Sequence, residues 1–183
     1  QRRPNWCAPL HNSKIDSEEM EVIRSEYDKM FERCNQTLAG FLHTVDSRNT
    51  FEVSDEERYA LWEHLYASKG FGTWQANFKD MLVDSKANKA MSDFVANKIR
   101  ERVNDPEIAE KLIPKDHGFG TRRVPLETKY FESYNQDNVE LVDISETPIK
   151  QITRNGIVTT DKEFEFDLII YATGFNAILG SYD

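Results

Sequence analysis

The feature that most constrains the fold is an almost uninterrupted apolar run near the C-terminal end of the sequence. Residues 166–172 read Phe-Asp-Leu-Ile-Ile-Tyr-Ala, and Thr173 and Gly174 follow directly. A run of this kind is typical of a strand that is buried on both faces of a parallel sheet. Gly174 permits a tight turn, and ligands of open α/β sheets bind beyond the carboxyl ends of the strands. The run therefore indicates an α/β fold with a strand that points toward a ligand, the alternative being a core strand that ends in a plain turn.

The composition fits one globular domain and excludes several classes of protein. Of the 183 residues, 39% are hydrophobic, which is too many for a disordered chain. The net charge of −9 repels phosphate backbones, so nucleic acid is not an expected partner. No run approaches the roughly 20 apolar residues of a membrane span, and we expect a cytoplasmic protein without a membrane partner. Two cysteines and four scattered histidines lack the spacing of metal ligands, so no metal site is expected.

Helical spacing of apolar residues runs through residues 16–114, after a connector over residues 1–15. Three helix starts are marked by residues that cap the first turn, two with capping-box spacing and one with proline behind the cap. They are Asp16 with Glu19, Ser54 with Glu57, and Asp105 with Pro106. Apolar stripes predict helices behind these starts and also over residues 74–82 and 91–103. The first two thirds of the chain are therefore expected to be helical.

From residue 115 onwards the sequence has the pattern of loops and strands. Residues 117–125 are expected to form a loop rich in glycine and charge, and residues 126–134 a short helix. Strand-like runs follow at residues 139–142, 149–152, 156–160 and 164–171. The Arg154-Asn155-Gly156 turn predicts a hairpin between two of these strands.

Two adjacent arginines stand in the glycine-rich loop. Arg122 and Arg123 follow Gly118, Gly120 and Thr121. A loop that presents two guanidinium groups is suited to bind phosphate or another oxyanion, because the planar donors match its oxygens. A solvated charged loop without a ligand is the alternative that the residues alone leave open.

Five stretches resemble class B flavoprotein monooxygenases, in particular the Baeyer–Villiger branch, and they follow one another in the order of that family. They are Gln1–Trp6, Asp105–Lys115, Phe119–Arg123, Asp137–Asp143 and Asp167–Ala177. The last of them resembles the final strand of the family's NADPH domain, which leads back to its FAD domain. The resemblance implies an α/β fold, an incomplete Rossmann-like NADPH domain with a large helical insertion and short C-terminal strands. It divides the chain into a connector after a Rossmann strand (1–15), the helical insertion (16–114), and the remainder of the NADPH domain, ending at the hinge to an FAD domain (115–183).

The same resemblance implies an enzyme that uses FAD, NADPH and O2 to oxidise a ketone. An oxygen atom would be inserted beside the carbonyl through a flavin peroxide, which gives an ester or a lactone. A flavin-dependent N- or S-oxygenase is the nearest alternative activity. A non-catalytic helical interaction module is the alternative from another class of protein. The partner implied for this chain is the remainder of the FAD domain.

The resemblance also implies roles for individual residues. Arg123 matches the family's catalytic arginine, which reaches the flavin and stabilises the anionic peroxide. Arg122 matches a contact to the 2′-phosphate of NADPH, and Arg2 matches the family's phosphate-binding arginine. Further cofactor contacts are expected from Arg3, Thr121, Thr173 and Gly174.

The sequence contains no glycine-rich turn of the form G-x-G-x-x-G, which cradles a pyrophosphate at a helix N-terminus. We therefore expect the 183-residue chain to be a fragment that by itself binds neither FAD nor NADPH well. After incubation with excess FAD and gel filtration, the absorption spectrum of the purified chain should show no flavin band. A stoichiometric yellow complex would contradict this expectation.

Overall fold

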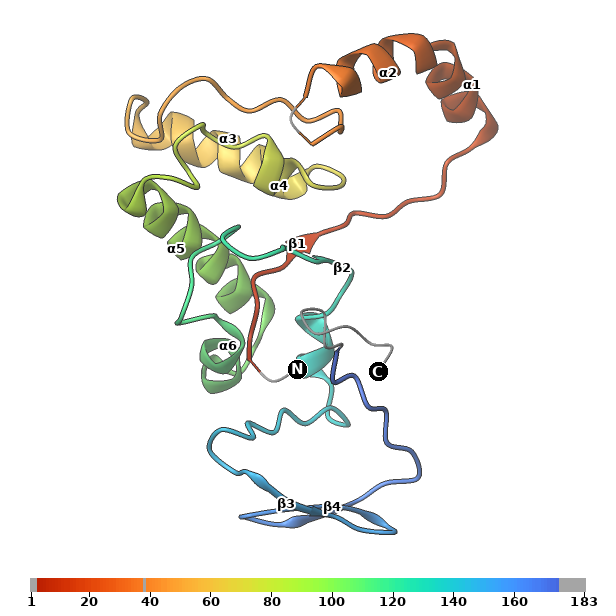
Figure 1. Ribbon diagram of the computed structural model, residues 1–183, viewed down its shortest axis with the longest axis vertical. Helices are drawn as coiled ribbons and strands as arrows, with labels where there is room; N and C mark the ends of the chain where they lie inside the picture. Colours follow the sequence, from red (N-terminus) through yellow and green to blue (C-terminus); the bar gives the residue numbers. More distant parts are fainter. Residues whose placement is uncertain (1–2, 38, 175–183) are drawn as a thin grey trace, which may run out of the picture.

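The computed structural model describes residues 3–37 and 39–174. A group of helices occupies one half of the described chain, and a small antiparallel sheet lies at the opposite end (Figure 1). The helices are α1 (Ser17–Ser25), α2 (Tyr27–Asn35), α3 (Asp55–Ala67), α4 (Gly72–Gln75), α5 (Ser85–Arg102) and α6 (Pro106–Leu112), followed by the 3-10 helix η1 (Glu132–Asn135). The strands are β1 (Ala8–Pro9), β2 (Leu126–Glu127), β3 (Ile149–Ile152), β4 (Gly156–Thr159) and β5 (Glu163–Glu165). Among the described helices, none combines the length and the apolar composition that a membrane span requires.

The starts of α3 and α6 are set by the capping residues that the sequence predicts. Ser54 Oγ accepts a hydrogen bond from Glu57 N at 3.2 Å, and Glu57 Oε2 accepts one from Ser54 N at 3.3 Å, which completes a capping box. Asp105 caps α6 by accepting hydrogen bonds from the backbone N–H groups of Glu107 and Ile108. Each cap satisfies N–H groups that have no partner within the helix. Both predicted starts are confirmed.

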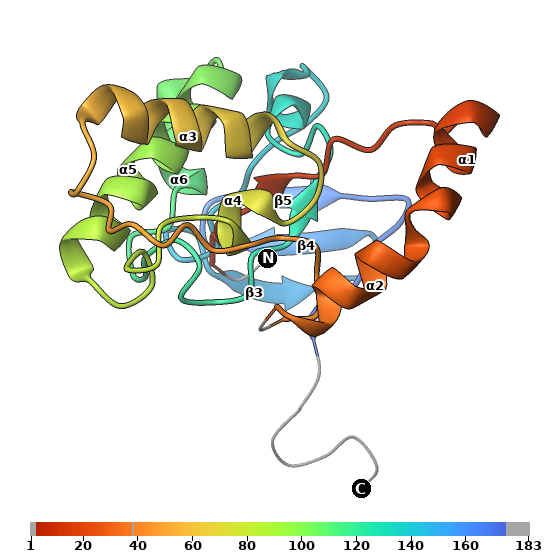
Figure 2. The same cartoon turned by 90° about the horizontal axis from the view of Figure 1, so that it is seen from above.

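The first predicted helix is present, but it stands apart from the other helices (Figure 2). Asp16 Oδ1 accepts a hydrogen bond from Glu19 N at 2.8 Å, as the spacing predicts. The helix is interrupted at Glu26, which divides it into α1 and α2. None of the side chains of these two helices is buried, and Phe31 is 63% exposed. The predicted apolar face therefore covers no part of the core.

One cluster of buried side chains joins α3, α5 and α6 to the segments that carry the arginines. Trp62 of α3 and Phe94 and Ile99 of α5 belong to this cluster. Trp6, near the start of the chain, and Phe119, in the loop after α6, are buried in the same cluster. Burial of an apolar side chain of this size contributes roughly 1.5–3 kcal/mol. The core therefore packs both arginine-bearing segments against the helices.

Arg102 links the C-terminal end of α5 to β2 and η1. Its guanidinium donates to Glu127 Oε1 at 2.8 Å, to the two oxygens of Glu132 at 2.6 and 2.8 Å, and to Tyr66 Oη at 3.0 Å. Glu127 is buried, and its second oxygen accepts a hydrogen bond from Tyr130 N at 2.9 Å. A buried carboxylate needs such partners, because removing a charge from water is costly. The network therefore fixes β2, and with it the parallel pair of β1 and β2, against the helices.

The helix predicted over residues 74–82 is wrong beyond its first residues. Only α4 is helical there, and turns follow it. Asn77 Oδ1 accepts hydrogen bonds from Phe78 N at 2.9 Å and from Trp62 Nε1 at 3.0 Å. A hydrogen bond from the neighbouring backbone N–H to an asparagine side chain competes with the backbone hydrogen bonds of a helix. The apolar stripe thus belongs to a compact turn that packs on α3.

The helix predicted over residues 126–134 is also wrong, because β2 and the start of η1 occupy this stretch. Leu10 N donates to Glu127 O at 2.9 Å, which ties the backbone to the start of the chain. Lys129 has a positive φ of 58°, a conformation that an α-helix does not contain. Pairing with a distant segment therefore decides the local structure here.

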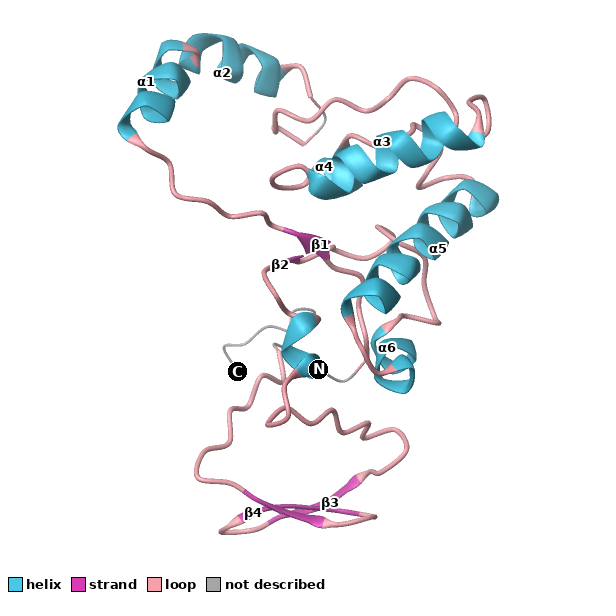
Figure 3. Ribbon diagram, turned by 180° about the vertical axis from the view of Figure 1, so that it is seen from behind, coloured by secondary structure: helices cyan, strands magenta, loops and turns pink. Residues whose placement is uncertain are grey.

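The hairpin predicted around Gly156 is confirmed. β3, β4 and β5 form an antiparallel sheet in chain order (Figure 2). A Cβ atom on Gly156 would lie 1.7 Å from Phe164 O, so only glycine fits beside β5. The strand predicted over residues 139–142 is absent, and a long loop joins η1 to β3 instead (Figure 3). Leu141 of this loop packs against the core, while its backbone has no strand neighbour among the described residues.

The predicted buried strand over residues 166–172 is wrong for the described chain. Phe166 N donates to Asn155 O at 2.9 Å, after which the backbone leaves the sheet. Leu168 is 74% exposed and Ile170 is 80% exposed. A parallel strand needs a neighbouring ladder, and parallel pairing within the described residues is confined to β1 with β2 and one isolated bridge. The apolar run has no such ladder to join.

Replacing Arg102 with methionine should destabilise the chain by about 3 kcal/mol, because it leaves the buried Glu127 carboxylate without its cation. Urea unfolding followed by tryptophan fluorescence measures this loss as a lower midpoint. Lys89→Met is the matched control, since Lys89 pairs with Asp93 on the exposed side of the same helix and such pairs contribute less than about 1 kcal/mol. Equal midpoints for the two variants would contradict the role of Arg102.

Candidate functional site

The arginine loop, residues 115–125, is held against α5. Asn88 Nδ2 donates to Phe119 O at 2.9 Å, and Phe119 N donates to a serine hydroxyl of the same helix at 2.9 Å. A Cβ atom on Gly118 would lie 1.6 Å from Asn88 Oδ1. Gly120 has a positive φ of 77°, which favours glycine. The two glycines therefore let the loop approach the helix closely and turn sharply.

Asp116 gathers two arginines that lie far apart in the sequence. Its Oδ2 accepts hydrogen bonds from Arg122 Nη2 at 3.1 Å and from Arg3 Nη1 at 3.3 Å. His117 Nδ1 lies 2.7 Å from Asp116 Oδ1. The hydrogen bond with His117 and the positive charge of Arg122 lower the pKa of the Asp116 carboxyl to about 2. Asp116 is therefore ionised at neutral pH and offsets part of the positive charge of the loop.

Arg123 is fixed through its backbone, while its side chain is exposed. Asn5 Nδ2 donates to Arg123 O at 3.0 Å, and Asn5 Oδ1 lies 2.9 Å from His117 Nε2. The part of the chain that the structure describes supplies no ion pair or hydrogen bond to the Arg123 guanidinium. Its charge is thus open to a ligand, whereas Arg3 and Arg122 share one carboxylate.

Four of the predicted site residues lie in this region. They are Arg3, Thr121, Arg122 and Arg123. Thr121 Oγ1 donates to Gly118 O at 2.9 Å, so its hydroxyl stabilises the turn of the loop. The guanidinium groups of Arg3 and Arg122 converge on Asp116, and such groups match the donors that phosphate and other oxyanions need.

The other predicted site residues are not joined to the arginine loop. Thr173 and Gly174 are exposed, and within residues 3–37 and 39–174 no hydrogen bond connects them to it. Gly174 has a positive φ of 83°, a conformation that suits a tight turn. Arg2 lies outside the described residues.

Two residues that organise the site, Asp116 and His117, were not among the predicted site residues. They stand directly before the glycine-rich part of the loop. Their partners Arg3 and Asn5 lie more than 110 residues away, so no pattern of neighbouring residues reveals the contacts. An acid and a histidine placed just before a glycine- and arginine-rich loop were the one local signal.

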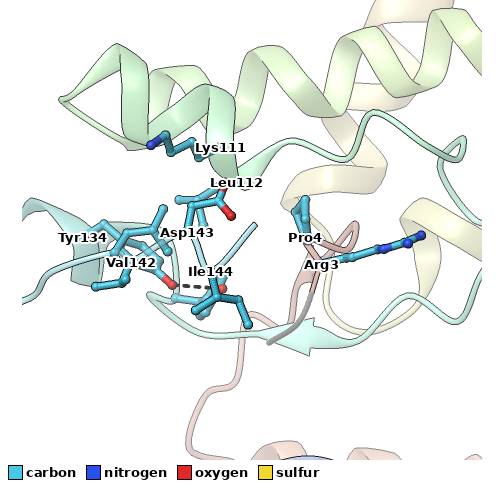
Figure 4. Close-up of a pocket in the computed structure, with 10 residues that line it drawn as sticks. Arg3, Pro4, Lys111, Leu112, Tyr134, Val142, Asp143 and Ile144 are labelled. Atoms are coloured by element: carbon cyan, nitrogen blue, oxygen red, sulfur yellow. Dashed lines mark hydrogen bonds between the residues drawn. The ribbon is translucent and has the colours of Figure 1, made fainter. Parts of the chain in front are cut away.

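A cavity of about 160 Å³ lies beside the start of the chain (Figure 4). Its lining includes Pro4, Lys111, Leu112, Tyr134 and Asp143. In Figure 4 the side chain of Arg3 extends away from Asp143, and its guanidinium pairs with Asp116 instead. Pockets for molecules of drug size usually measure about 300–1,000 Å³, so this cavity is too small for a dinucleotide.

The donor chemistry of the arginine loop suits the phosphate end of a dinucleotide. Exposed guanidinium groups bind phosphate through paired N–H donors. The described residues contain no turn of the form G-x-G-x-x-G, which cradles a pyrophosphate at a helix N-terminus. They also contain no group of histidine, cysteine and carboxylate side chains that could hold a metal ion. The exposed guanidinium groups of the region therefore suit a phosphate contact.

Comparison with known proteins finds relatives that are monooxygenases. No family model matches the chain. Over 183 residues it is 51% identical to the 2-oxo-Delta(3)-4,5,5-trimethylcyclopentenylacetyl-CoA monooxygenase of Pseudomonas putida, covering 100% of the chain and 34% of that protein. It is 44% identical to cyclopentanone 1,2-monooxygenase of Comamonas sp., and the match covers 98% of the chain and 33% of that protein. It is 36% identical to phenazine N-monooxygenase of Lysobacter antibioticus, and the match covers 100% of the chain and 34% of that protein. The crystal structure of OTEMO in complex with FAD and NADP matches with a TM-score of 0.95 and 51% identity, over 99% of the chain and 34% of that structure.

Over its whole length the chain matches a part of these enzymes in sequence and in fold, which relates it to a class of monooxygenases that includes OTEMO, whose crystal structure contains FAD and NADP. Within that class it is related to the Baeyer–Villiger monooxygenases and corresponds to a segment of them, which confirms the resemblance carried by the five stretches. The chain spans about a third of the length of the relatives it matches.

The low pKa of Asp116 predicts how the site responds to acid. The ordinary pKa is 3.8 and the folded value is about 2, so the contacts of the ionised carboxylate are fully present above pH 3.8 and are lost as the pH falls through about 2. In an NMR titration, the Asp116 carboxyl carbon should therefore change near pH 2. In the His117→Ala variant the midpoint of the Asp116 titration should rise toward the ordinary pKa of an aspartate. An unchanged midpoint would contradict the assigned cause.

Proposed function

We propose that the chain supplies cationic residues to a Baeyer–Villiger-type monooxygenase, which oxidises a ketone to an ester or a lactone. The observation that carries the proposal is the gathering of Arg3, Arg122 and Arg123 at a loop that α5 holds in place. The name of the relative cyclopentanone 1,2-monooxygenase supports a ketone as the substrate class. In the overall reaction one atom of O2 enters the substrate, the other leaves as water, and NADPH supplies the two electrons.

Arg3 and Arg122 are suited to bind the 2′-phosphate of NADPH. Both side chains are exposed, and both already converge on one anionic group, the Asp116 carboxylate. A phosphate would compete with this carboxylate for the same donors, and it offers more oxygens for paired hydrogen bonds. Further contacts to the cofactors are proposed for Arg2, Thr121, Thr173 and Gly174.

Arg123 is suited to stabilise negative charge that develops during oxygen transfer. FAD, when bound, would supply the chemistry of oxygen activation. The Arg123 guanidinium would hold the charge at the reacting oxygen, in a site from which the whole protein excludes water. Within the described chain this guanidinium has no carboxylate partner, which supports the role because a paired guanidinium attracts an anion less strongly.

An apolar cavity of about 290 Å³ close to the same loop suits the carbon skeleton of a ketone. Trp74, Phe78 and Leu82 are among the side chains that line it. Atoms of Trp74 and Leu82 lie 2.9 Å from the position of a Cβ atom on Gly120, so the arginine loop packs against two of the side chains that line the cavity. Ligand pockets are mostly apolar with a few polar groups at one side, and the arginines would supply those groups.

We also propose the domain division that the resemblance implies. Residues 1–15 would be the connector, 16–114 the helical insertion, and 115–183 the remainder of a Rossmann-like NADPH domain. The exposed side chains of Leu168 and Ile170 support this division, because a parallel sheet in the whole protein would bury them. A cytoplasmic location stays a prediction.

Oxygenation of nitrogen is the second candidate activity. It is favoured by the phenazine N-monooxygenase, which is 36% identical over the whole chain. Product analysis of the full-length protein with a cyclic ketone and with an aromatic nitrogen heterocycle separates the two activities, since one gives a lactone and the other an N-oxide. The end-to-end match to enzymes speaks against a non-catalytic interaction module.

In the full-length protein, Arg123→Ala should lower the rate of ketone oxygenation by roughly 100-fold or more, as expected for the loss of a group that stabilises developing negative charge. Gas chromatography of the ester or lactone measures the rate. Arg154→Ala is the matched control, because Arg154 is an exposed arginine in the hairpin turn. Ketone oxygenation at the wild-type rate in Arg123→Ala would refute the role of Arg123.

A further inference from the structure

His117 has no part in the proposed function, yet its side chain is buried beside the arginines, with only 5% of its surface exposed. The two ring nitrogens have different partners. Nδ1 lies 2.7 Å from Asp116 Oδ1, and Nε2 lies 2.9 Å from Asn5 Oδ1. The Trp6 ring packs edge-on against the imidazole, and Trp6 Nε1 donates to His117 O at 2.9 Å. A buried ring with both nitrogens engaged has a fixed orientation.

The orientation of the Asn5 amide determines the direction of its hydrogen bonds to Arg123 and to His117. The carbonyl oxygen of Arg123 can only accept, so the Asn5 amide nitrogen faces it, and Asn5 Oδ1 faces His117. Because Asn5 Oδ1 also only accepts, His117 Nε2 donates. The Asp116 carboxylate lies at the other ring nitrogen, with Oδ1 2.7 Å from Nδ1. An ordered series of hydrogen bonds thus runs from His117 through Asn5 to the backbone of Arg123.

The two ring nitrogens act on different arginines. Nδ1 holds Asp116, which pairs with Arg3 and Arg122. Nε2 holds Asn5, which bonds to the Arg123 carbonyl across a separation of 118 residues. Residues 121–125 belong to no helix or strand. Backbone hydrogen bonds hold the two ends of this stretch, from Thr121 N to Gly118 O and from Ala8 N to Pro125 O, and the Asn5 side chain holds the backbone of Arg123 between them.

We propose that His117 is a positioning residue for Arg123: through Asn5 it fixes the backbone from which the Arg123 side chain extends. The proposal rests on the proposed function, in which Arg123 holds charge at the reacting oxygen. A displacement of about 1 Å in a reacting group can lower a rate by about 100-fold. The buried hydrogen bonds of Asn5 and His117 are therefore expected to act on catalysis without contact to the substrate.

The test uses the full-length protein and two variants that each keep one side of the ring. In His117→Gln the side-chain amide nitrogen takes the place of Nε2 and can donate to Asn5. In His117→Asn the amide nitrogen takes the place of Nδ1 and can donate to Asp116. Both variants put a neutral amide at the same buried position, so each is the matched control of the other. Asn5→Leu removes the link at its other end.

We expect His117→Gln to keep kcat within about threefold of the wild type, while His117→Asn and Asn5→Leu lower it roughly 10- to 100-fold with little change in the KM for the ketone. A loss of general stability would instead affect both His117 variants. Hydrogen exchange of the peptide that spans residues 118–125 gives a readout independent of activity. It should be faster in His117→Asn and Asn5→Leu but not in His117→Gln.

Equal kcat values and equal exchange in the two His117 variants would overturn the proposal. Unchanged exchange in Asn5→Leu would overturn it as well, and this variant decides the matter if the His117 variants fail to fold. A wild-type protein that oxidises no ketone would refute the proposed function instead. In that case the exchange comparison still shows whether His117 positions the backbone of Arg123.

Discussion

The guanidinium of Arg102 sets the geometry on which the rest of the chain depends. It joins the C-terminal end of α5 to Tyr66 of α3, Glu127 of β2 and Glu132 of η1. Burial alone would lower the pKa of Arg102, but the hydrogen bonds to Glu132 and Glu127 outweigh this effect and hold the pKa above its ordinary value. The partly buried guanidinium group therefore remains a cation. Because Arg102 anchors β2, the strand that follows the arginine loop, the C-terminal end of the loop is held in place. The loop is also held by its direct contact with α5.

The arginine loop concentrates positive charge on a chain whose net charge is −9. Such a distribution favours a small anion at one place, while the acidic remainder of the surface repels polyanions such as nucleic acid. Asp116 adds a second effect. As an internal anion it keeps Arg3 and Arg122 together without a ligand, at the cost of competing with the ligand that they would bind.

The outcome of each sequence prediction follows from the range of the interactions behind it. The starts of α3 and α6 and the turn at Gly156 depend on residues within a few positions, and the sequence predicts them correctly. The stretch 126–134 and the run at 166–172 depend on distant strand partners, and their predictions fail. The site divides in the same way. Arg122 and Arg123 are recognisable because they adjoin two glycines, whereas Asp116 and His117 acquire their roles from Arg3 and Asn5, at the other end of the chain.

The exposed run at residues 166–171 governs how the chain behaves in concentrated solution. Leu168, Ile170 and Tyr171 are exposed, and the run contains no proline. It follows β5, whose outer edge is open in the described chain. Short apolar segments with these properties are typical nuclei of edge-to-edge aggregation. The apolar side chains of this run therefore form an exposed surface through which copies of the chain can associate.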